Sequence, residues 1–111
     1  MQTDDTPLLR VSTQAEGGVT VLRLAGELDL ATSRQLDQRV RTVLRGEAGV
    51  RRLVIDLGGL EFLDVSGLTA LLHARDRIAA SDGTMALRRP RPMVLRMLSL
   101  LQLEDRLEIE D

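Results

Sequence analysis

The stretch "LVIDLGGLEFLDVSGLTALLHA", residues 53 to 74, combines two patterns that decide the fold. Its first five residues, up to Leu57, are almost continuously apolar, which is typical of a central strand covered on at least one full face. After a "GGLEFLD" turn, apolar residues recur at helical spacing from Leu68 onward, so we expect a helix from about Ser66 to Ala80. A strand followed by a helix is the repeating unit of an α/β fold.

The rest of the chain repeats this alternation of strands and helices. The expected elements are a β-hairpin of 8–13 and 19–25 around Gly17-Gly18, a helix over about 32–45, a strand over 85–88, a helix opened by Pro92, and an edge strand at 107–109. Residues 26–29, "GELD", should interrupt the strand before the first helix. We therefore predict an α/β fold with a mixed, mostly parallel sheet of four or five strands, an N-terminal β-hairpin and about three helices.

Length and composition narrow the classes of function. The 111 residues suit one domain, so we expect a single domain over residues 1–111, and the 43% hydrophobic content argues against disorder. Phe62 is the only aromatic residue, which argues against base-stacking nucleic-acid modules. The net charge is −2, so we expect neither a nucleic-acid partner nor a membrane partner.

The residue types and segments that the sequence lacks exclude further classes of function. The chain contains no Cys and a single His, His73, so we expect no metal site and no cofactor. Its first residues lack the basic start and apolar run of a secretory signal, and no apolar stretch is long enough to span a bilayer. The expected location is the cytoplasm.

Ser66, in the centre of the opening stretch, has three interpretations. It could be a helix cap, a nucleophile, or an acceptor of phosphate, and from the local residues alone the cap is favoured. His73 is seven residues further along the same helix. That spacing is about 10 Å at 1.5 Å per residue, beyond hydrogen-bond reach, and no GxSxG elbow is present, so a serine hydrolase is disfavoured.

Three aspartates and a basic run carry weaker signals. Asp29, Asp56 and Asp64 could suggest a magnesium-binding cluster of the phosphotransfer-receiver kind, but such domains need a late Lys and this chain has none. We expect Asp56 to close a strand and Asp29 to stand at a helix entry, where it or Thr32 could provide the cap. The run "RRPRP", residues 88–92, is better interpreted as a solvated loop than as a nucleic-acid contact.

Two stretches together resemble a known family. "LAGELDLATS", residues 24–33, and "LVIDLGGLEFLDVSGLTALLHA", residues 53–74, resemble the two signature stretches of the STAS domain, and more specifically those of bacterial anti-sigma-factor antagonists. The spacing between the stretches and the later segment "PMVLRMLSLLQLEDRLEI" fit the same family. The resemblance implies the STAS fold and a regulatory binding protein rather than an enzyme.

The resemblance also implies a site. In antagonists the serine of the D-x-S-G element is phosphorylated, and by position this residue is Ser66; Val65 stands where antagonists often have a further serine. We expect His73 to lie at the surface beside the partner-binding face. The full set of expected partner-binding residues is Glu27, Asp29, Asp64, Val65, Ser66, Gly67, Thr69, Ala70 and His73.

A partner-switching cycle follows from the resemblance. The unphosphorylated protein would bind an anti-sigma factor that is a serine kinase, and would thereby release the sigma factor. Phosphorylation of Ser66 would break the complex, and a serine phosphatase would reset it. The alternative is a STAS subunit of a lipid or anion transport assembly.

Overall fold

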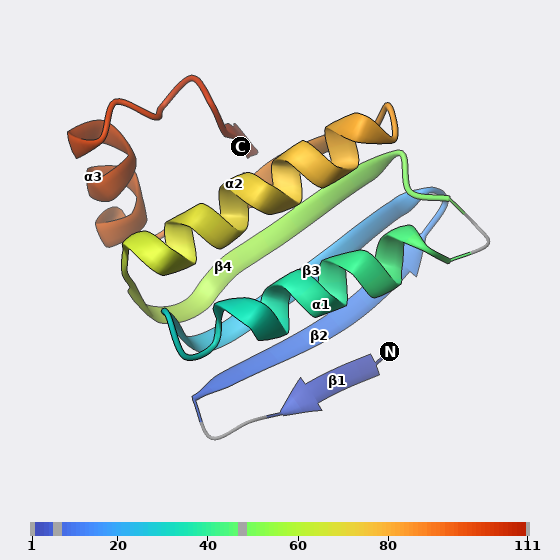
Figure 1. The fold of residues 1–111 in the computed structure, drawn as a ribbon, viewed down its shortest axis with the longest axis horizontal. Helices are drawn as coiled ribbons and strands as arrows, with labels where there is room; N and C mark the ends of the chain where they lie inside the picture. Colours follow the sequence, from blue (N-terminus) through green and yellow to red (C-terminus); the bar gives the residue numbers. More distant parts are fainter. Residues whose placement is uncertain (1, 6–7, 47–48, 111) are drawn as a thin grey trace.

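Six strands and three helices make up the described part of the chain. The structure is a computed structural model that describes residues 2–5, 8–46 and 49–110. The elements are β1 (Gln2–Asp5), β2 (Leu9–Glu16), β3 (Val19–Leu28), α1 (Ser33–Leu44), β4 (Arg52–Leu63), α2 (Val65–Ala80), β5 (Thr84–Arg88), α3 (Pro92–Leu100) and β6 (Glu108–Glu110) (Figure 1).

The six strands form one mixed sheet in chain order, β1-β2-β3-β4-β5-β6. The pairs β1–β2 and β2–β3 are antiparallel, and the pairs from β3 to β6 are parallel. The predicted α/β class, mixed sheet and opening hairpin are confirmed. The sheet has one strand more than the predicted four or five, because the polar β1 pairs through its backbone with β2 and shows no apolar alternation.

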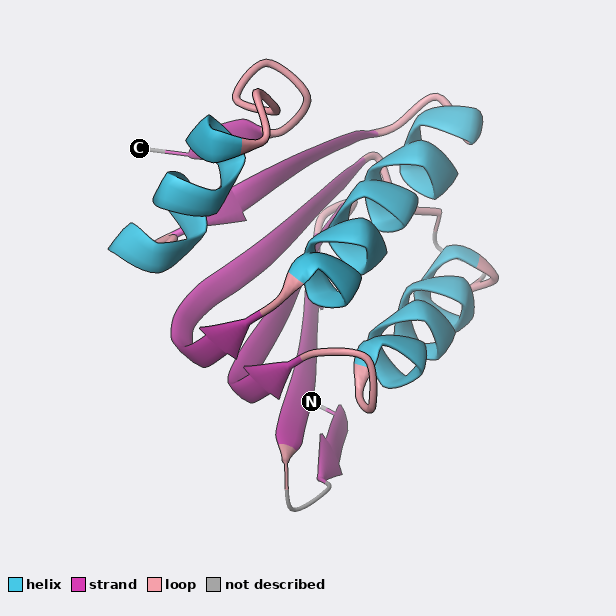
Figure 2. Cartoon of the chain, turned by 60° about the vertical axis from the view of Figure 1, so that its left-hand side comes forward, coloured by secondary structure: helices cyan, strands magenta, loops and turns pink. Residues whose placement is uncertain are grey.

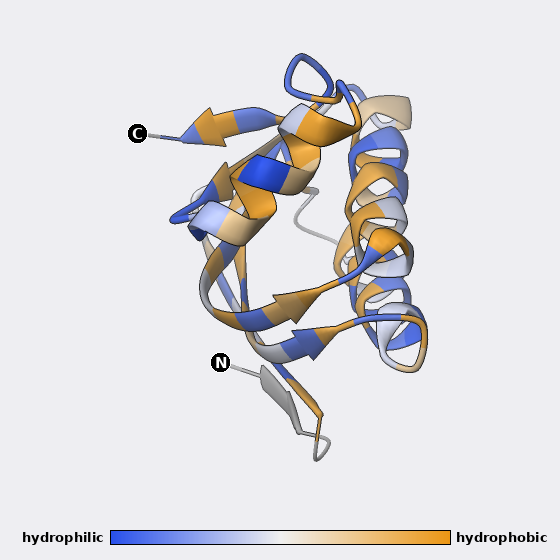
Figure 3. Cartoon of the chain, turned by 90° about the vertical axis from the view of Figure 1, so that its left-hand side faces the viewer, coloured by the Kyte–Doolittle hydropathy of each residue, from blue (hydrophilic) through white to orange (hydrophobic). Residues whose placement is uncertain are grey.

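The helices are divided between the two sides of the sheet. α1 and α2 lie side by side against one face, and α3 lies on the other side (Figure 2). Hydrophobic and hydrophilic residues alternate along the helices, as expected for elements with one buried side (Figure 3). The core is aliphatic, and its largest fully buried side chains include Leu22, Leu24, Leu36, Leu53, Ile55, Leu57, Leu68, Leu71 and Ile78.

Two predicted interruptions are wrong, because strands run through both. β3 continues through Gly26 and Glu27 to Leu28, and β4 continues through "GGLEFL" to Leu63. The pairing of β3 with β4 shifts register twice on this stretch, so the glycines lie at irregularities within paired strands rather than in turns. Gly26 has φ +106°, and a Cβ there would lie 2.3 Å from the Leu8 carbonyl oxygen, which explains the need for glycine.

A row of alternating charge crosses the sheet on the face opposite α1 and α2. Arg23 pairs in register with Asp56, Asp56 with Arg88, and Arg88 with Glu110. Arg88 Nε donates to Glu110 Oε1 at 2.6 Å. Beside this row, Arg52 donates to Glu108 at 2.6 Å, and this hydrogen bond lowers the pKa of the Glu108 carboxyl. The charged side chains of this face therefore neutralise one another.

Asp56 lies inside β4 and does not close a strand as predicted. Its side chain is only 3% exposed and accepts two hydrogen bonds from Arg89, at 2.6 and 3.1 Å, and one from the Gly58 N–H at 3.0 Å. Burial alone would raise the pKa of Asp56, but these bonds and the charges of Arg89 and Arg23 hold it below its usual value. The first half of "RRPRP" is thus tied to the sheet.

No helix within the described ranges is both long and apolar enough to cross a membrane.

Candidate functional site

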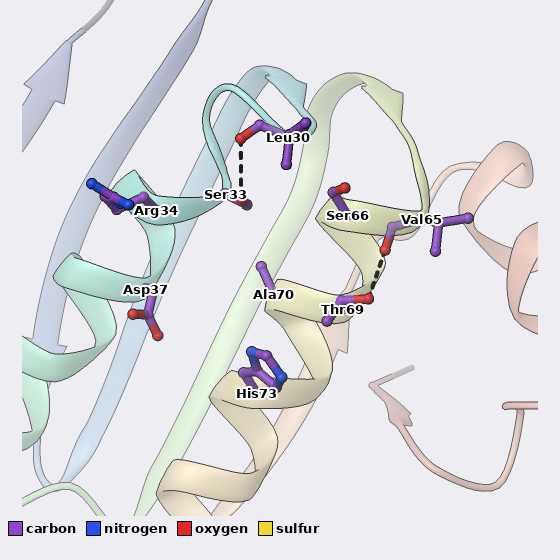
Figure 4. Close-up of a pocket in the computed structure, with 9 residues that line it drawn as sticks. All are labelled: Leu30, Ser33, Arg34, Asp37, Val65, Ser66, Thr69, Ala70 and His73. Atoms are coloured by element: carbon purple, nitrogen blue, oxygen red, sulfur yellow. Dashed lines mark hydrogen bonds between the residues drawn. The ribbon is translucent and has the colours of Figure 1, made fainter.

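The first turns of α1 and α2 form a pocket at one edge of the sheet. β3 and β4 are parallel neighbours and each is followed by a helix, so both helices begin at the same edge. The pocket has a volume of about 370 Å³ (Figure 4). We call it the helix-start pocket; it is lined by Leu30, Ser33, Arg34, Asp37, Val65, Ser66, Thr69, Ala70 and His73.

Asp64, not Ser66, caps α2. Its backbone is extended, and its Oδ1 accepts a hydrogen bond from the Gly67 N–H at 2.9 Å. Ser66 is the second residue of the helix, just inside its N-terminus. Among the described residues, none forms a hydrogen bond with the Ser66 hydroxyl, which is partly exposed at the pocket. The serine is therefore available to chemistry from outside the chain.

Gly67 lies beneath this surface. A Cβ at Gly67 would fall 2.2 Å from the Leu28 carbonyl oxygen and 2.8 Å from Leu63 Cδ1. Glycine therefore allows the first turn of α2 to touch the end of β3. Ala70, one of the expected partner-binding residues, is also largely covered, at 7% exposure. Ala70 lines the helix-start pocket together with Ser33, Arg34 and Asp37 of α1.

A hydrogen-bond network fixes the loop between β3 and α1. Asp29 Oδ1 accepts from the N–H groups of Ala31 and Thr32, at 2.9 and 3.1 Å. The hydroxyl of Thr32 donates to the Glu27 carbonyl at 2.8 Å and accepts from the Asp29 N–H at 3.0 Å. Thr32 is 4% exposed, so these bonds satisfy a buried group. The network holds Leu30 at the mouth of the pocket.

Apolar side chains border Ser66. Leu30, which is 77% exposed, and Val65, which is 62% exposed, line the helix-start pocket together with Ser66. Exposed aliphatic residues around a polar centre are typical of a protein-binding surface. Val65 belongs to the expected partner-binding residues, whereas Leu30 does not, because its only signal in the sequence is an apolar residue inside a polar loop.

The charged groups of the pocket come mainly from α1, and those on α1 were not among the residues expected at the site. Asp37 accepts hydrogen bonds from Arg41 on its own helix and from Arg77 on α2, both at 3.1 Å. Arg34 makes no ion pair or side-chain hydrogen bond within the described ranges. These residues could not be placed beside Ser66 without knowing that α1 and α2 are neighbours.

The enzymatic and metal-binding alternatives gain no support from the geometry. Ser66 and His73 line the same pocket, but no hydrogen bond joins them in the described part of the chain. Asp29 and Asp64 bind backbone N–H groups at the helix starts, whereas Asp56 pairs with arginines on the other face of the sheet. Over residues 2–5, 8–46 and 49–110, no three His, Cys, Asp or Glu residues are grouped to hold a metal ion.

Comparisons with known proteins identify the family. The model of the STAS domain matches residues 10–111. The chain belongs to the STAS domain family, as the two sequence stretches predicted.

Its similarities within the family are to antagonists. The chain is 30% identical to the "Anti-sigma F factor antagonist" of Paenibacillus polymyxa over 92 residues, which are 83% of this chain and 78% of that protein. It is 34% identical to the "Anti-sigma-F factor antagonist RsfB" of Mycobacterium tuberculosis over 73 residues, which are 66% of this chain and 58% of that protein.

Solved structures agree with this placement. A crystal structure of an anti-sigma factor antagonist from Mycobacterium paratuberculosis superposes with a TM-score of 0.79 at 26% identity, covering 94% of this chain and 87% of the other. The STAS fold is also found in the murine anion transporter Slc26a9, with a TM-score of 0.68 at 20% identity, but only 14% of that chain is covered. The second similarity shows the fold alone.

Proposed function

We propose that this chain is an anti-sigma factor antagonist switched by phosphorylation of Ser66. In its unphosphorylated form it binds an anti-sigma factor with serine kinase activity in the cytoplasm and frees the sigma factor. Phosphorylation ends the complex, and a serine phosphatase restores the free form. The observation that carries the proposal is the unbonded Ser66 hydroxyl at the mouth of the helix-start pocket, between exposed Leu30 and Val65.

The start of α2 suits a phosphorylated serine. The Asp64 side chain bonds only the Gly67 N–H, so the N–H groups of residues 65 and 66 keep no helical partner. Free N–H groups and the helix dipole favour an anion at this position. A phosphate on Ser66 is therefore compatible with the fold, and its effect falls on whatever covers the surface.

The expected energies are large enough for phosphorylation of Ser66 to control partner binding. Phosphorylation adds about −1.5 to −2 charges at neutral pH. A partner that seals apolar Leu30 and Val65 would have to desolvate that charge, at a cost of several kcal/mol. Since each ~1.4 kcal/mol changes affinity tenfold, a loss of about a thousandfold is expected.

The expected contact residues fall into two groups. The side chains that reach the surface are Val65, Ser66, Thr69 and His73 on α2, with Glu27, Asp29 and Asp64 at the strand ends. Gly67 and Ala70 are both buried and support the surface from below. We propose the first group as the direct contacts of the partner.

The test is phosphorylation by the cognate anti-sigma factor kinase with ATP, followed by intact-mass measurement. The wild-type chain should gain one phosphate, and Ser66→Ala should gain none while still binding the kinase. Ser33→Ala is the matched control, because Ser33 lines the same pocket but is bonded to the Leu30 carbonyl at 3.4 Å. A label that survives in Ser66→Ala, or disappears in Ser33→Ala, would contradict the assignment.

The transport-assembly alternative has less support. Structures titled as transport proteins, the murine anion transporter and a sulfate transporter family protein from Wolinella succinogenes, match at only 20% and 13% identity, which shows the fold alone. The curated relatives, in contrast, are named as anti-sigma factor antagonists.

A further inference from the structure

A second pocket lies at the other end of the same two helices. It has a volume of about 340 Å³ and is lined by Arg41, Leu44, Arg45, Arg77 and Ala80. Three arginines and two apolar residues thus line this pocket. We call it the arginine pocket.

Asp37 connects the two pockets. It lines the helix-start pocket, and it accepts hydrogen bonds from Arg41 and Arg77, which line the arginine pocket. Arg34 in one pocket and Arg45 in the other make no ion pair or side-chain hydrogen bond in the described part of the chain. The residues that line the two pockets include four arginines and one aspartate, a net charge of +3 on a chain whose net charge is −2. The proposed contacts Glu27, Asp29 and Asp64 line neither pocket.

Helix stability explains only part of this arrangement. Arg41 and Arg77 stand in the last turns of their helices, where a cation is favourable. Arg34, in contrast, is the second residue of α1, whose first turn has no acidic residue. A cation there opposes the helix dipole. Arg34 therefore adds positive charge at a position where the helix itself disfavours it.

We infer that the helix-start pocket and the arginine pocket form one docking surface for an acidic region of the protein partner. Residues 66 and 77 are about 16 Å apart along α2 at 1.5 Å per residue. A standard interface of roughly 800 Å² per partner covers that distance. The inference rests on the proposed function for the identity of the partner, and it adds the chemistry of the surface that the partner presents.

The surface gives phosphorylation a second effect. A phosphate on Ser66 adds up to about two negative charges beside pocket linings of net charge +3, which reduces their attraction for an acidic partner. Besides the local cost at the contact, the phosphorylated chain should therefore associate more slowly. Charge attraction acts mainly on association rates.

The first test compares two variants of equal total charge. Arg34→Glu/Arg45→Glu changes the docking surface, and Arg96→Glu/Arg106→Glu changes two exposed arginines that line neither pocket. Association with the cognate anti-sigma factor is measured by stopped flow at 20 and 300 mM NaCl. The first variant should associate at least about tenfold more slowly at low salt and within about twofold of wild type at high salt. The control should stay within about twofold throughout.

The second test does not depend on the anti-sigma factor. A hexaglutamate peptide is titrated into the chain while the arginine Nε–H signals are followed by NMR. Shifts should concentrate on Arg34, Arg41, Arg45 and Arg77, and should be absent from Arg96 and Arg106. Uniform shifts over all arginines, or tenfold tighter binding of a short DNA duplex, would overturn the inference of an acidic protein partner.

The two tests separate the two proposals. Binding of the anti-sigma factor with equal slowing by both variants would overturn the docking surface and leave the proposed function intact. Failure of the wild-type chain to bind it, together with selective hexaglutamate shifts, would overturn the proposed function and leave the acid-binding surface intact.

Discussion

The outer surface of α1 and α2 and the charged face of the sheet use polar residues in opposite ways. On the sheet face, Arg52, Asp56, Arg88 and Arg89 all have partners within the chain. On the helix surface, the Ser66 hydroxyl and the Arg34 and Arg45 guanidinium groups have none in the described part of the chain. Paired groups stabilise the fold, whereas unpaired groups beside exposed apolar residues are available for binding.

The largest expected effect is on the paired face. Asp56→Ala removes a buried carboxylate and three hydrogen bonds, so we expect a loss of about 3 kcal/mol in the free energy of unfolding. Urea denaturation measures the loss. Asp76→Ala is the control, because Asp76 is exposed and should cost less than about 0.5 kcal/mol. Equal losses in the two variants would show that a buried, hydrogen-bonded carboxylate stabilises the fold no more than an exposed one.

A substitution at Gly67 tests how closely the first turn of α2 packs against the end of β3. Gly67→Ala places a Cβ against the Leu28 carbonyl, and we expect a destabilisation of about 2 kcal/mol. Thr69→Ala, on the exposed side of the same helix, should change stability by less than about 0.5 kcal/mol. Thermal unfolding of both variants gives the comparison. A neutral Gly67→Ala would mean that the helix start can move away from β3.

Acid should weaken the paired face selectively. The folded pKa of Asp56 is lowered, so the stability that its ionised form contributes is complete above the unfolded pKa of about 3.9 and is lost as the pH falls through the folded value. The stability advantage of wild type over Asp56→Asn should be full above pH 5 and shrink below about pH 4. Urea titrations at pH 7, 5, 4 and 3 measure it, and a gap that widened towards pH 3 would contradict the sign.

The cap of α2 should contribute less. Asp64→Ala leaves the Gly67 N–H without its acceptor, and loss of such a cap costs about 1 kcal/mol. Asp64→Asn should retain most of the stability, since an amide oxygen also caps. Chemical denaturation of the pair distinguishes a cap from a general charge effect. If the two variants lose the same amount, the carboxylate charge rather than the cap is responsible.

The smallest effect should come from the unpaired arginines. Arg34→Ala and Arg45→Ala break no hydrogen bond or ion pair of the described chain, so the melting temperature should stay within about 2 °C of wild type. Calorimetry checks this, and the same variants should still slow association with the partner. A substantial loss of stability would show that these two arginines stabilise the fold, as the paired charges of the sheet face do.

Much of the fold could be predicted because the apolar patterns are local. The helical spacing that begins at Leu68 and the apolar run that ends at Leu57 both correspond to observed elements. The glycine stretches misled because a glycine at a strand irregularity and a glycine in a turn have the same local signature. β1 was missed because its pairing depends on the edge offered by β2 and not on its own side chains.

Of the residues that line the helix-start pocket, those on α2 were expected from the sequence. The D-x-S-G element located Ser66, and the residues following it on α2 could be placed by helical spacing. Leu30 lies in the loop between β3 and α1, and Arg34 and Asp37 lie on α1; only the packing of α1 beside α2 brings them to the same pocket. The pairing of Asp56 with Arg89 likewise joins residues 33 positions apart, which no local pattern encodes.

The contact between Gly67 and the Leu28 carbonyl has a mechanical consequence. With no slack between helix and strand, the first turn of α2 cannot sink or tilt to accommodate a bulky group on its neighbour Ser66. The fold therefore acts as a rigid support. A group attached to Ser66 must project outward, and its effect falls entirely on the molecule that binds this surface.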